Sequence, residues 1–535
     1  MRTPLLPRLA FALAALAFVL GGCGGGGKVF QTAGFRASSP TFVLPFTPSL
    51  SGESGWLVLA NYTDRDADVF ATAYKPNTGG APMGEEFAPG TTFTVPARGS
   101  LRTPLGVLMG PASGPGFLYV DTRDVTTLDP VTGEPTPVDT TGFVIPSIER
   151  ELIGVFQRGD ACQGLVPQDM GVSVGVHGLT TQVQVINTSY SPMAGGVVHE
   201  PLLVTIRQLE ADGSELTASD VLLPPLGSLE FAPAITLGQV LVTPKAPVPV
   251  GVMPRLSIAT REEGGVVHVA PRYQDTDEVL DEVHDIGWFA DWGVDPYGNV
   301  HDFSFLLSNP TDDTLTATLR AVQREGASAI LSTPRVLAIA PHRTVLLGTT
   351  NVASDGLELG ESTPFGDLFG DALAAQGTES VALWLAVPRD LEVSARTFDP
   401  AFGSYYTVER GGRRTTNAFA SSQPVEAVLG TGRFHDLLLA NPSNNNITIP
   451  MRVHTPGGTE YILPNIVLAP FQRMTYTLDG SIFKEDPNSL VEPPLDRVKV
   501  KFSPLSGAFI AARTRRTDAN GLLILVTPRI VDAAD

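Results

Sequence analysis

Cysteine is scarce in this chain, since only Cys23 and Cys162 occur among its 535 residues. A framework of several disulfides is therefore excluded, and apolar cores must supply the stability of the fold. Histidine is scarce too, with eight residues scattered along the chain. No H-E-x-x-H or C-x-x-C pattern occurs, so the common zinc motifs are missing. These shortages favour a protein that is not an enzyme, although a site assembled from distant strands leaves no mark in a sequence.

Positive charge and cofactor motifs are the next shortages. The chain has 36 Lys and Arg against 56 Asp and Glu, which gives a formal net charge of -20 at pH 7. An acidic surface disfavours nucleic acid as a partner, so we expect none. The nearest match to a phosphate-binding loop ends at Lys28, and Val29 stands where a Ser or Thr would bind magnesium. We therefore expect no cofactor.

Amphipathic helical patterns are nearly absent after residue 23, and a period of two takes their place. Leu315, Ala317 and Leu319 alternate with threonines, for example, and 54 Gly and 45 Pro punctuate such stretches. Alternation of this kind predicts β strands with one buried and one wet face, as in antiparallel two-layer sandwiches.

The amino terminus carries a motif of a different kind. Residues 9–20 form a continuous apolar run behind Arg2 and Arg8. Its twelve residues suit the core of a signal peptide and fall short of the about 20 that span a bilayer. The run ends in the letters LGGC, with Cys23 last, and this sequence resembles the lipobox of bacterial lipoproteins. The resemblance implies that Cys23 is acylated and becomes the first residue of the mature chain.

The lipobox resemblance also implies a location. Acyl chains on Cys23 would make a membrane the first partner of this chain, and the glycines at 24–27 would form a flexible tether. Gly24 after the cysteine resembles lipoproteins that are exported to an outer membrane. We therefore expect a lipid-anchored protein of the cell envelope, at the outer membrane, with its body facing the periplasm or the cell surface.

Three landmarks recur in one order in four stretches of the chain. The first is a strand that ends in Asn before a polar turn, at Asn61, Asn187, Asn309 and Asn441, which are 126, 122 and 132 residues apart. The second is a proline-led turn into a further strand, at Pro96, Pro225, Pro341 and Pro470. The third is an arginine beside a threonine in a later strand, at Arg123, Arg261, Arg396 and Arg513. Landmarks at a regular spacing indicate tandem copies of one unit.

The sequence thus predicts an all-β fold of four tandem antiparallel β-sandwich domains. Their size and architecture resemble the immunoglobulin-like modules of bacterial surface proteins, without the Cys…Trp…Cys pattern of true immunoglobulin domains. The predicted division is a signal peptide at 1–22, the lipidated cysteine and tether at 23–41, and sandwiches at 42–145, 146–272, 273–410 and 411–535.

The segment 273–302, between the second and third copies, is the candidate ligand site. It concentrates acidic and aromatic residues, of which Asp285, Trp288, Asp291 and Trp292 are the leading candidates. Exposed rings beside carboxylates suit a sugar, because rings stack on the ligand and carboxylates accept its hydroxyls. The alternative is an interdomain joint in which the tryptophans fill the seam, and we favour that alternative.

Two shorter patterns compete with structural explanations. Asp64, Asp66 and Asp68 match the first acidic positions of a calcium loop, but Val69 stands where the sharp turn needs Gly, so a solvated turn is favoured over a metal site. The G-x-S-x-G match at 171–175 has valines alternating straight through it. That alternation predicts a strand with Ser173 on its polar face rather than a nucleophile elbow.

These features together predict a membrane-anchored envelope lipoprotein that acts without catalysis as a scaffold, adhesin or ligand-binding stalk. Its partners would be the membrane, through Cys23, and an envelope protein or a glycan. The alternative is a carbohydrate-binding accessory protein or a hydrolase with its site in the 273–302 joint.

Overall fold

The structure is a computed structural model of the chain. It describes residues 41–46, 53–61, 66–76, 84–110, 114–121, 127–128, 135–136, 144–152, 158–163, 171–177, 182–193, 196–262, 265–267, 283–290, 293–294, 300–323, 330–331, 335–348, 362–364, 381–388, 391–399, 405–409, 412–415, 425–430, 434–440, 445–470, 472–478, 497–502, 511–517, 523–526 and 529–530. Within these residues nearly all regular structure is strand, and α2 (Gly106–Met109) is a single helical turn. The predicted all-β class of antiparallel sandwiches is confirmed.

One arrangement of eight strands occurs four times along the described chain. When the strands of a copy are numbered by position, one sheet has the order first, sixth, third, fourth, and the other has the order fifth, second, seventh, eighth. We call these the 1-6-3-4 sheet and the 5-2-7-8 sheet, and we call each copy a repeat. Neighbouring strands within both sheets are antiparallel.

The strands of the first two repeats are as follows, from the first position to the eighth. The first repeat has β1 (Thr41–Phe46), β2 (Glu53–Asn61), β3 (Ala67–Tyr74), β4 (Thr91–Val95), β5 (Ser100–Pro104), β6 (Gly116–Asp121), β9 (Val144–Leu152) and β10 (Arg158–Gln163). The second has β11 (Val172–His177), β12 (Gln182–Asn187), β15 (Leu202–Glu210), β16 (Glu215–Leu223), β17 (Ser228–Phe231), β18 (Leu237–Pro244), β19 (Leu256–Glu262) and β20 (Gly265–Val267).

The last two repeats follow the same order. The third has β21 (Val283–Ala290), β23 (Val300–Ser308), β24 (Leu315–Gln323), β26 (Arg335–Ile339), β27 (Thr344–Gly348), β29 (Val381–Pro388), β30 (Glu392–Asp399) and β31 (Tyr405–Glu409). The fourth has β33 (Val425–Gly430), β34 (Phe434–Ala440), β35 (Ile447–His454), β36 (Glu460–Leu468), β37 (Arg473–Leu478), β38 (Arg497–Phe502), β39 (Ala511–Thr517) and β40 (Leu523–Val526).

Short strands are added to this plan in single repeats. Two hairpins stand apart from the main sheets, β7 (Thr127–Leu128) with β8 (Pro135–Thr136), and β13 (Tyr190–Met193) with β14 (Gly196–His199). The others extend sheets and are β22 (Gly293–Val294), β25 (Ile330–Leu331), β28 (Ser362–Pro364), β32 (Gly412–Thr415) and β41 (Arg529–Ile530).

The landmarks found in the sequence fall at matching positions of the repeats. Each Asn ends or directly follows a second strand, and each proline-led turn precedes a fifth strand. Arg261, Arg396 and Arg513 lie in the seventh strands β19, β30 and β39. The first repeat departs from this rule, because its seventh strand is β9, while Arg123 follows the sixth strand and lies outside the described residues. A landmark of two or three residues does not reveal which strand carries it.

Five of the eight strand positions pair as in immunoglobulin-like sandwiches. The fifth strand pairs with the second as E pairs with B, and the fourth, third and sixth pair as C′, C and F do. The remaining pairs differ, since the first strand takes the place of G beside the sixth, and the seventh takes the place of A beside the second. The immunoglobulin likeness therefore applies to the middle of each sandwich.

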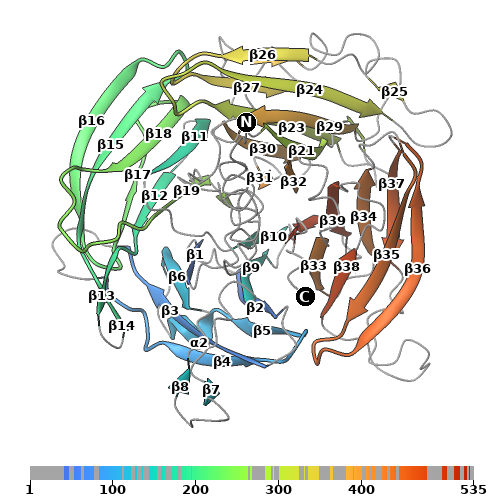
Figure 1. The fold of residues 1–535 in the computed structure, drawn as a ribbon, viewed down its shortest axis with the longest axis horizontal. Helices are drawn as coiled ribbons and strands as arrows, with labels where there is room; N and C mark the ends of the chain where they lie inside the picture. Colours follow the sequence, from blue (N-terminus) through green and yellow to red (C-terminus); the bar gives the residue numbers. More distant parts are fainter. Residues whose placement is uncertain are drawn as a thin grey trace, which may run out of the picture.

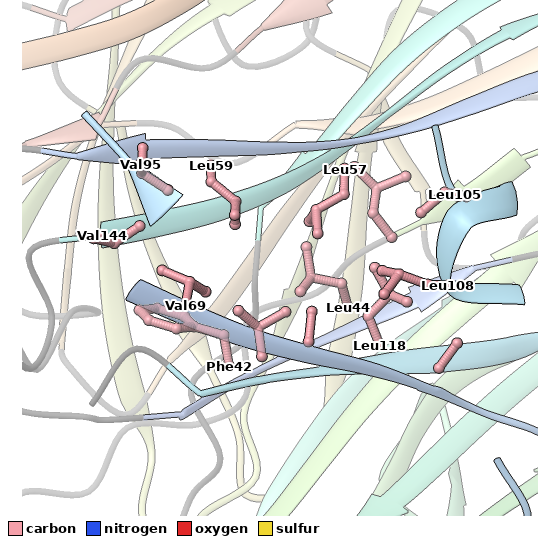
Figure 2. Close-up of a cluster of buried hydrophobic side chains, with 14 of the residues drawn as sticks. Phe42, Leu44, Leu57, Leu59, Val69, Val95, Leu105, Leu108, Leu118 and Val144 are labelled. Atoms are coloured by element: carbon pink, nitrogen blue, oxygen red, sulfur yellow. The ribbon is translucent and has the colours of Figure 1, made fainter. Parts of the chain in front are cut away.

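The core of the first sandwich lies between its two sheets (Figure 2). Leu44 and Leu118 come from the 1-6-3-4 sheet, Leu57 and Val144 come from the 5-2-7-8 sheet, and Leu108 of α2 packs into the same buried cluster. Full burial of a side chain of this size contributes about 1.5–3 kcal/mol to folding. The second repeat has a buried cluster of the same kind between its two sheets, as alternating strands predict.

The sandwiches stand around a common centre, and neighbouring repeats pack sheet against sheet (Figure 1). The 1-6-3-4 sheet of the first repeat meets the 5-2-7-8 sheet and turn of the second in a buried cluster of Val43, Tyr74, Phe117, Tyr119, Ile186 and Leu226. In the next seam, Leu237 of the second repeat packs against Leu306 and Leu346 of the third. Strand β21 of the third lies against β39 of the fourth.

The fourth repeat returns to the first and closes the ring. Strand β40 pairs in parallel with β10, which joins the inner ends of two 5-2-7-8 sheets into one sheet of eight strands. The Ser100 amide of the first repeat donates to the Pro456 carbonyl of the fourth, 3.1 Å away. Head-to-tail contacts close into a ring when the last copy meets the first. Radially placed four-stranded sheets are also the arrangement of β-propellers.

Ring packing changes the burial that strand alternation predicts. Strands near the centre, such as β6 and β12, are buried along almost their whole length, because one face meets the partner sheet and the other meets a neighbouring repeat. Strand β16 at the rim is exposed over its first six residues. The expectation of one wet face for every strand is therefore wrong for the central strands.

Two predicted domain boundaries fall inside this pattern of strands. The boundary between residues 145 and 146 lies within β9, and both β9 and β10 belong to the sheet of β2. The boundary between 410 and 411 precedes β32, which pairs with β21 of the third repeat. Independent folding of each repeat as a domain stays a prediction.

Closure of the ring makes Gly99 a sensitive position. A Cβ atom there would overlap the Pro456 carbonyl oxygen of the fourth repeat, and main chain cannot move aside as a flexible side chain does. We expect Gly99→Ala to destabilise the chain by about 1–3 kcal/mol and to speed hydrogen exchange at the Ser100 amide. Gly106→Ala is the control, because a Cβ at Gly106 meets nothing within 4 Å. Unchanged protection of Ser100 in Gly99→Ala would contradict the closed seam.

Candidate functional site

A buried asparagine ties the two sheets together in each repeat where it is described. The strand at the second position of a repeat ends at this residue or directly before it, and Asn61, Asn187 and Asn309 are all 0% exposed. Their Nδ2 atoms donate to carbonyls at the end of the fourth strand, where the chain leaves the 1-6-3-4 sheet. Asn187 reaches Leu223 at 3.2 Å, and Asn309 reaches Ile339 at 3.0 Å. We call this group the asparagine clamp.

The other side of the amide shapes the turn after the strand. Asn187 Oδ1 accepts from the Ser189 amide, and Asn309 Oδ1 accepts from the Thr311 amide, each at 2.9 Å. An asparagine that bonds the backbone two residues on is an Asx turn, as the Asn-initiated turns in the sequence predict. Asn441 at the corresponding place in the fourth repeat lies outside the described residues.

The proline-led turn that the clamp holds has the same shape in the first three repeats. Hydrogen bonds from the fourth residue to the first close it at Gly99–Pro96, Gly227–Pro224 and Arg343–Ala340, and Gln472–Ala469 makes the matching bond in the fourth. Its third residue has a positive φ of 56° at Arg98, 50° at Leu226 and 59° at His342. Such a conformation disfavours any residue except glycine by about 1–2 kcal/mol, so the surroundings must hold these turns in place.

Each of these turns receives the third–fourth strand hairpin of the preceding repeat. Gly84 of the first repeat donates its amide to the Pro225 carbonyl of the second, at 2.8 Å. The Thr344 amide of the third repeat donates to Ala211 of the second at 3.0 Å, which repeats the bond from Ser100 to Pro456 at the closing seam. The proline-led turn of one repeat is therefore the place where the hairpin of the preceding repeat is bound.

Two of the hairpins that contact these turns share a pattern that the sequence landmarks missed. Gly213 and Gly458 turn the hairpins of the second and fourth repeats with φ of 90° and 89°. An ion pair closes each hairpin, from Arg207 to Glu215 and from Arg452 to Glu460, at 2.6 Å in both. The sequence signal for these hairpins is an arginine eight residues before a glutamate, with a Gly-Ser or Gly-Thr turn between them.

Ser173 lies in the seam between the second and third repeats. It belongs to β11, which runs straight through the G-x-S-x-G match, so the strand interpretation is confirmed. The polar face on which it was expected is not wet, because Ser173 is 0% exposed. Its Oγ donates to Glu392 Oε2 of the third repeat at 2.9 Å, and the Gly175 amide donates to Glu392 Oε1 at 3.2 Å. The pair is a structural contact between repeats.

The candidate ligand residues in the 273–302 segment are only partly described. Asp285 and Trp288 lie in β21, the first strand of the third repeat, opposite Ala386 and Leu383 of β29. Asp291 and Trp292 lie outside the described residues. A ligand site in this segment stays a prediction.

The calcium candidates are spread over separate partners. Asp66 is exposed and its Oδ1 accepts from the Ala97 amide at 2.8 Å, whereas Asp68 Oδ1 accepts from Thr94 Oγ1 at 2.6 Å. Asp64 lies outside the described residues. A search of the described residues finds no group of three or more His, Cys, Asp or Glu side chains placed to hold a metal ion.

The lipidation candidate, Cys23, lies outside the described residues. None of the helices in the described part of the chain has the length and apolar character that crossing a membrane requires.

Comparisons with known proteins give little more. No family model matches the chain, and no curated protein matches it. Among solved structures, the chain is similar to a tetra-tandem repeat in the extending region of a large adhesion protein, with 11% sequence identity. The alignment covers 92% of this chain and 99% of that one, with a TM-score of 0.09. A TM-score this low carries no conclusion about the fold or function of this chain.

The asparagine clamp can be tested with an isosteric change. In Asn187→Asp the side chain keeps its shape but loses the Nδ2 donors, and it places a carboxylate against the carbonyls of Glu200, Leu223 and Pro224. We expect a loss of at least about 2 kcal/mol of unfolding free energy, measured by urea denaturation. Asn446→Asp, on an exposed residue, is the control. Equal stability of the two variants would contradict a structural role for the clamp.

Proposed function

We propose that this chain is a lipid-anchored protein of the cell envelope whose ring of sandwiches serves as a non-catalytic body for scaffolding or ligand binding. The observation that supports the lipid anchor most directly is the lipobox resemblance of the sequence that ends at Cys23. The signal-peptide core before it and the glycine tether after it have the order that such an anchor needs.

The polar side chains of the described seams support a structural rather than a catalytic role. Ser173, Glu392 and Gln239 are buried between the second and third repeats, and each bonds to the other repeat. Gln239 Nε2, for example, donates to the carbonyls of Asn309 and His342, at 3.0 and 2.6 Å. These groups hold the ring together, which leaves its rim and connecting loops as the surface for partners.

The ring also bears on the choice among scaffold, adhesin and stalk. A linear array of four sandwiches would give reach away from the membrane, whereas a chain whose fourth repeat pairs with its first stays compact. We therefore favour a compact body on a flexible tether, which acts as a scaffold or binds an envelope protein or a glycan. An adhesive role would then depend on the ring rim.

The anchor and its location are tested together on cells. We expect labelled palmitate to be incorporated into the wild-type chain and to be lost in Cys23→Ala, while Cys162→Ala retains it. In membrane fractionation we expect the wild-type chain and Cys162→Ala in the membrane fraction and Cys23→Ala in the soluble fraction. Labelling of Cys23→Ala, or membrane retention of that variant without label, would contradict the proposed anchor.

Protease treatment of intact cells then assigns the face of the membrane. Cleavage of the wild-type chain on intact cells would place the ring outside the cell and support a surface ligand. Protection until lysis would place the ring in the periplasm and exclude an adhesive role. A periplasmic protein should be measured in the same samples to confirm that the cells stayed intact.

A further inference from the structure

The second repeat carries an apolar loop that is exposed over part of its length. It connects the sixth strand, β18, to the seventh, β19. From residue 246 to 254 it reads APVPVGVMP, nine residues without a polar or charged side chain. Val250 is 105% exposed and Met253 is 45% exposed. Loops at a protein surface normally carry polar residues, so an apolar one of this length indicates a contact surface.

Backbone hydrogen bonds fix both ends of this loop to the body. The Lys245 amide donates to Leu203 at 2.9 Å where the loop begins. Near its end, Met253 and Tyr190 exchange two backbone bonds of 2.8 and 3.1 Å. A turn closed by the Val252 amide and the Pro249 carbonyl, at 3.1 Å, shapes the tip between them. Val250 is therefore held at the surface, whereas Val248 packs against the core of the repeat.

The β13–β14 hairpin enlarges the apolar surface beside the loop. Tyr190, which holds Met253, begins β13 and pairs with His199 at the end of β14. Val198, the next residue along β14, is 44% exposed. Both the hairpin and the loop belong to the second repeat, and the hairpin lies at the lower left of the ring rim (Figure 1). We call residues 246–254 together with Val198 the apolar tip.

The loop of the apolar tip carries no acid of its own. Lys245 precedes it and forms an ion pair with Asp220, and Arg255 follows it with its guanidinium 5.9 Å from the centre of the Tyr190 ring. No carboxylate occurs from residue 245 to 255 in a chain whose net charge is -20. Among other exposed apolar residues, Leu222 and Ile462 lie two residues from an acid, at Asp220 and Glu460, as Val198 of the tip does from Glu200.

An apolar surface without acids suits the headgroup region of a bilayer. Carboxylates resist transfer out of water, whereas valine and methionine gain from it. Two or three side chains bury too little surface to hold a soluble protein on a membrane. A lipid anchor removes that difficulty, because it keeps the tip at a high effective concentration beside the bilayer. Cys23 precedes Thr41 by 18 residues, and a segment of that length spans at most about 60 Å.

We propose that the apolar tip is a second membrane contact, which inserts among the headgroups of a neutral bilayer and orients the anchored ring. This inference rests on the proposed lipid anchor at Cys23. It adds that the rim near β13 and β14 faces the bilayer, which leaves the opposite part of the rim free for a partner.

An environment-sensitive fluorophore at the tip tests the proposal in the lipidated protein. Cys162→Ser removes the second thiol, acylation occupies Cys23, and Val250→Cys then provides a single site for the NBD label. After reconstitution into phosphatidylcholine and phosphatidylethanolamine vesicles, we expect the emission at position 250 to shift to the blue and iodide quenching to fall at least about threefold. Ile462→Cys, a 75% exposed apolar position of the fourth repeat, is the matched control and should show neither change.

The outcomes separate this inference from the anchor on which it rests. Flotation of the same samples with the vesicles measures the anchor alone. Flotation with no shift at either position overturns the membrane contact and leaves the anchor standing. Equal shifts at positions 250 and 462 also overturn it, because the ring then has no preferred orientation. Failure to float in lipidated protein overturns the anchor and this inference together.

Discussion

In the three repeats where it is described, the buried asparagine at the end of the second strand makes the hydrogen bonds on which the rest of the architecture depends. Its amide holds the 5-2-7-8 sheet to the chain as that chain leaves the 1-6-3-4 sheet, and its backbone amide bonds the turn that follows, as Asn187 does to Gly227 at 2.9 Å. The same turn receives the hairpin of the preceding repeat. One buried side chain thus couples the closure of a sandwich to the position of its neighbour, and an apolar residue there would leave buried carbonyls without donors.

Closure distinguishes this chain from an open array of repeats. In a linear array each repeat contacts only its neighbours, and the two ends are free. Here the bond from Ser100 to Pro456 repeats the bond from Thr344 to Ala211 between the third and second repeats, and the pairing of β10 with β40 adds a strand contact between the first and fourth repeats. Burial then follows distance from the centre, because inner strands are covered on both faces and rim strands are not. The surface available for partners is the rim with its loops, including the tip around Val250.

Local features of this fold were readable in the sequence, and contacts between repeats were not. Asn187 and Asn309 predict turns because an asparagine side chain accepts a hydrogen bond from the backbone amide two residues on. Both partners of this bond are close in the sequence, so the sequence reveals it. The meeting of Ser100 with Pro456 depends on how four sandwiches pack, which no spacing reveals. Ser173 shows the same limit, since alternation correctly predicts its strand but says nothing of the repeat that covers it.

The closed ring is tested most directly by small-angle X-ray scattering of the soluble Cys23→Ala chain, starting at residue 23. A ring in which the fourth repeat returns to the first predicts a radius of gyration of about 24 Å, the value for a compact chain of this length. The distance distribution should have a single, nearly symmetric peak. A rod-like scattering curve with a much larger radius would show the repeats in a row and would contradict the account.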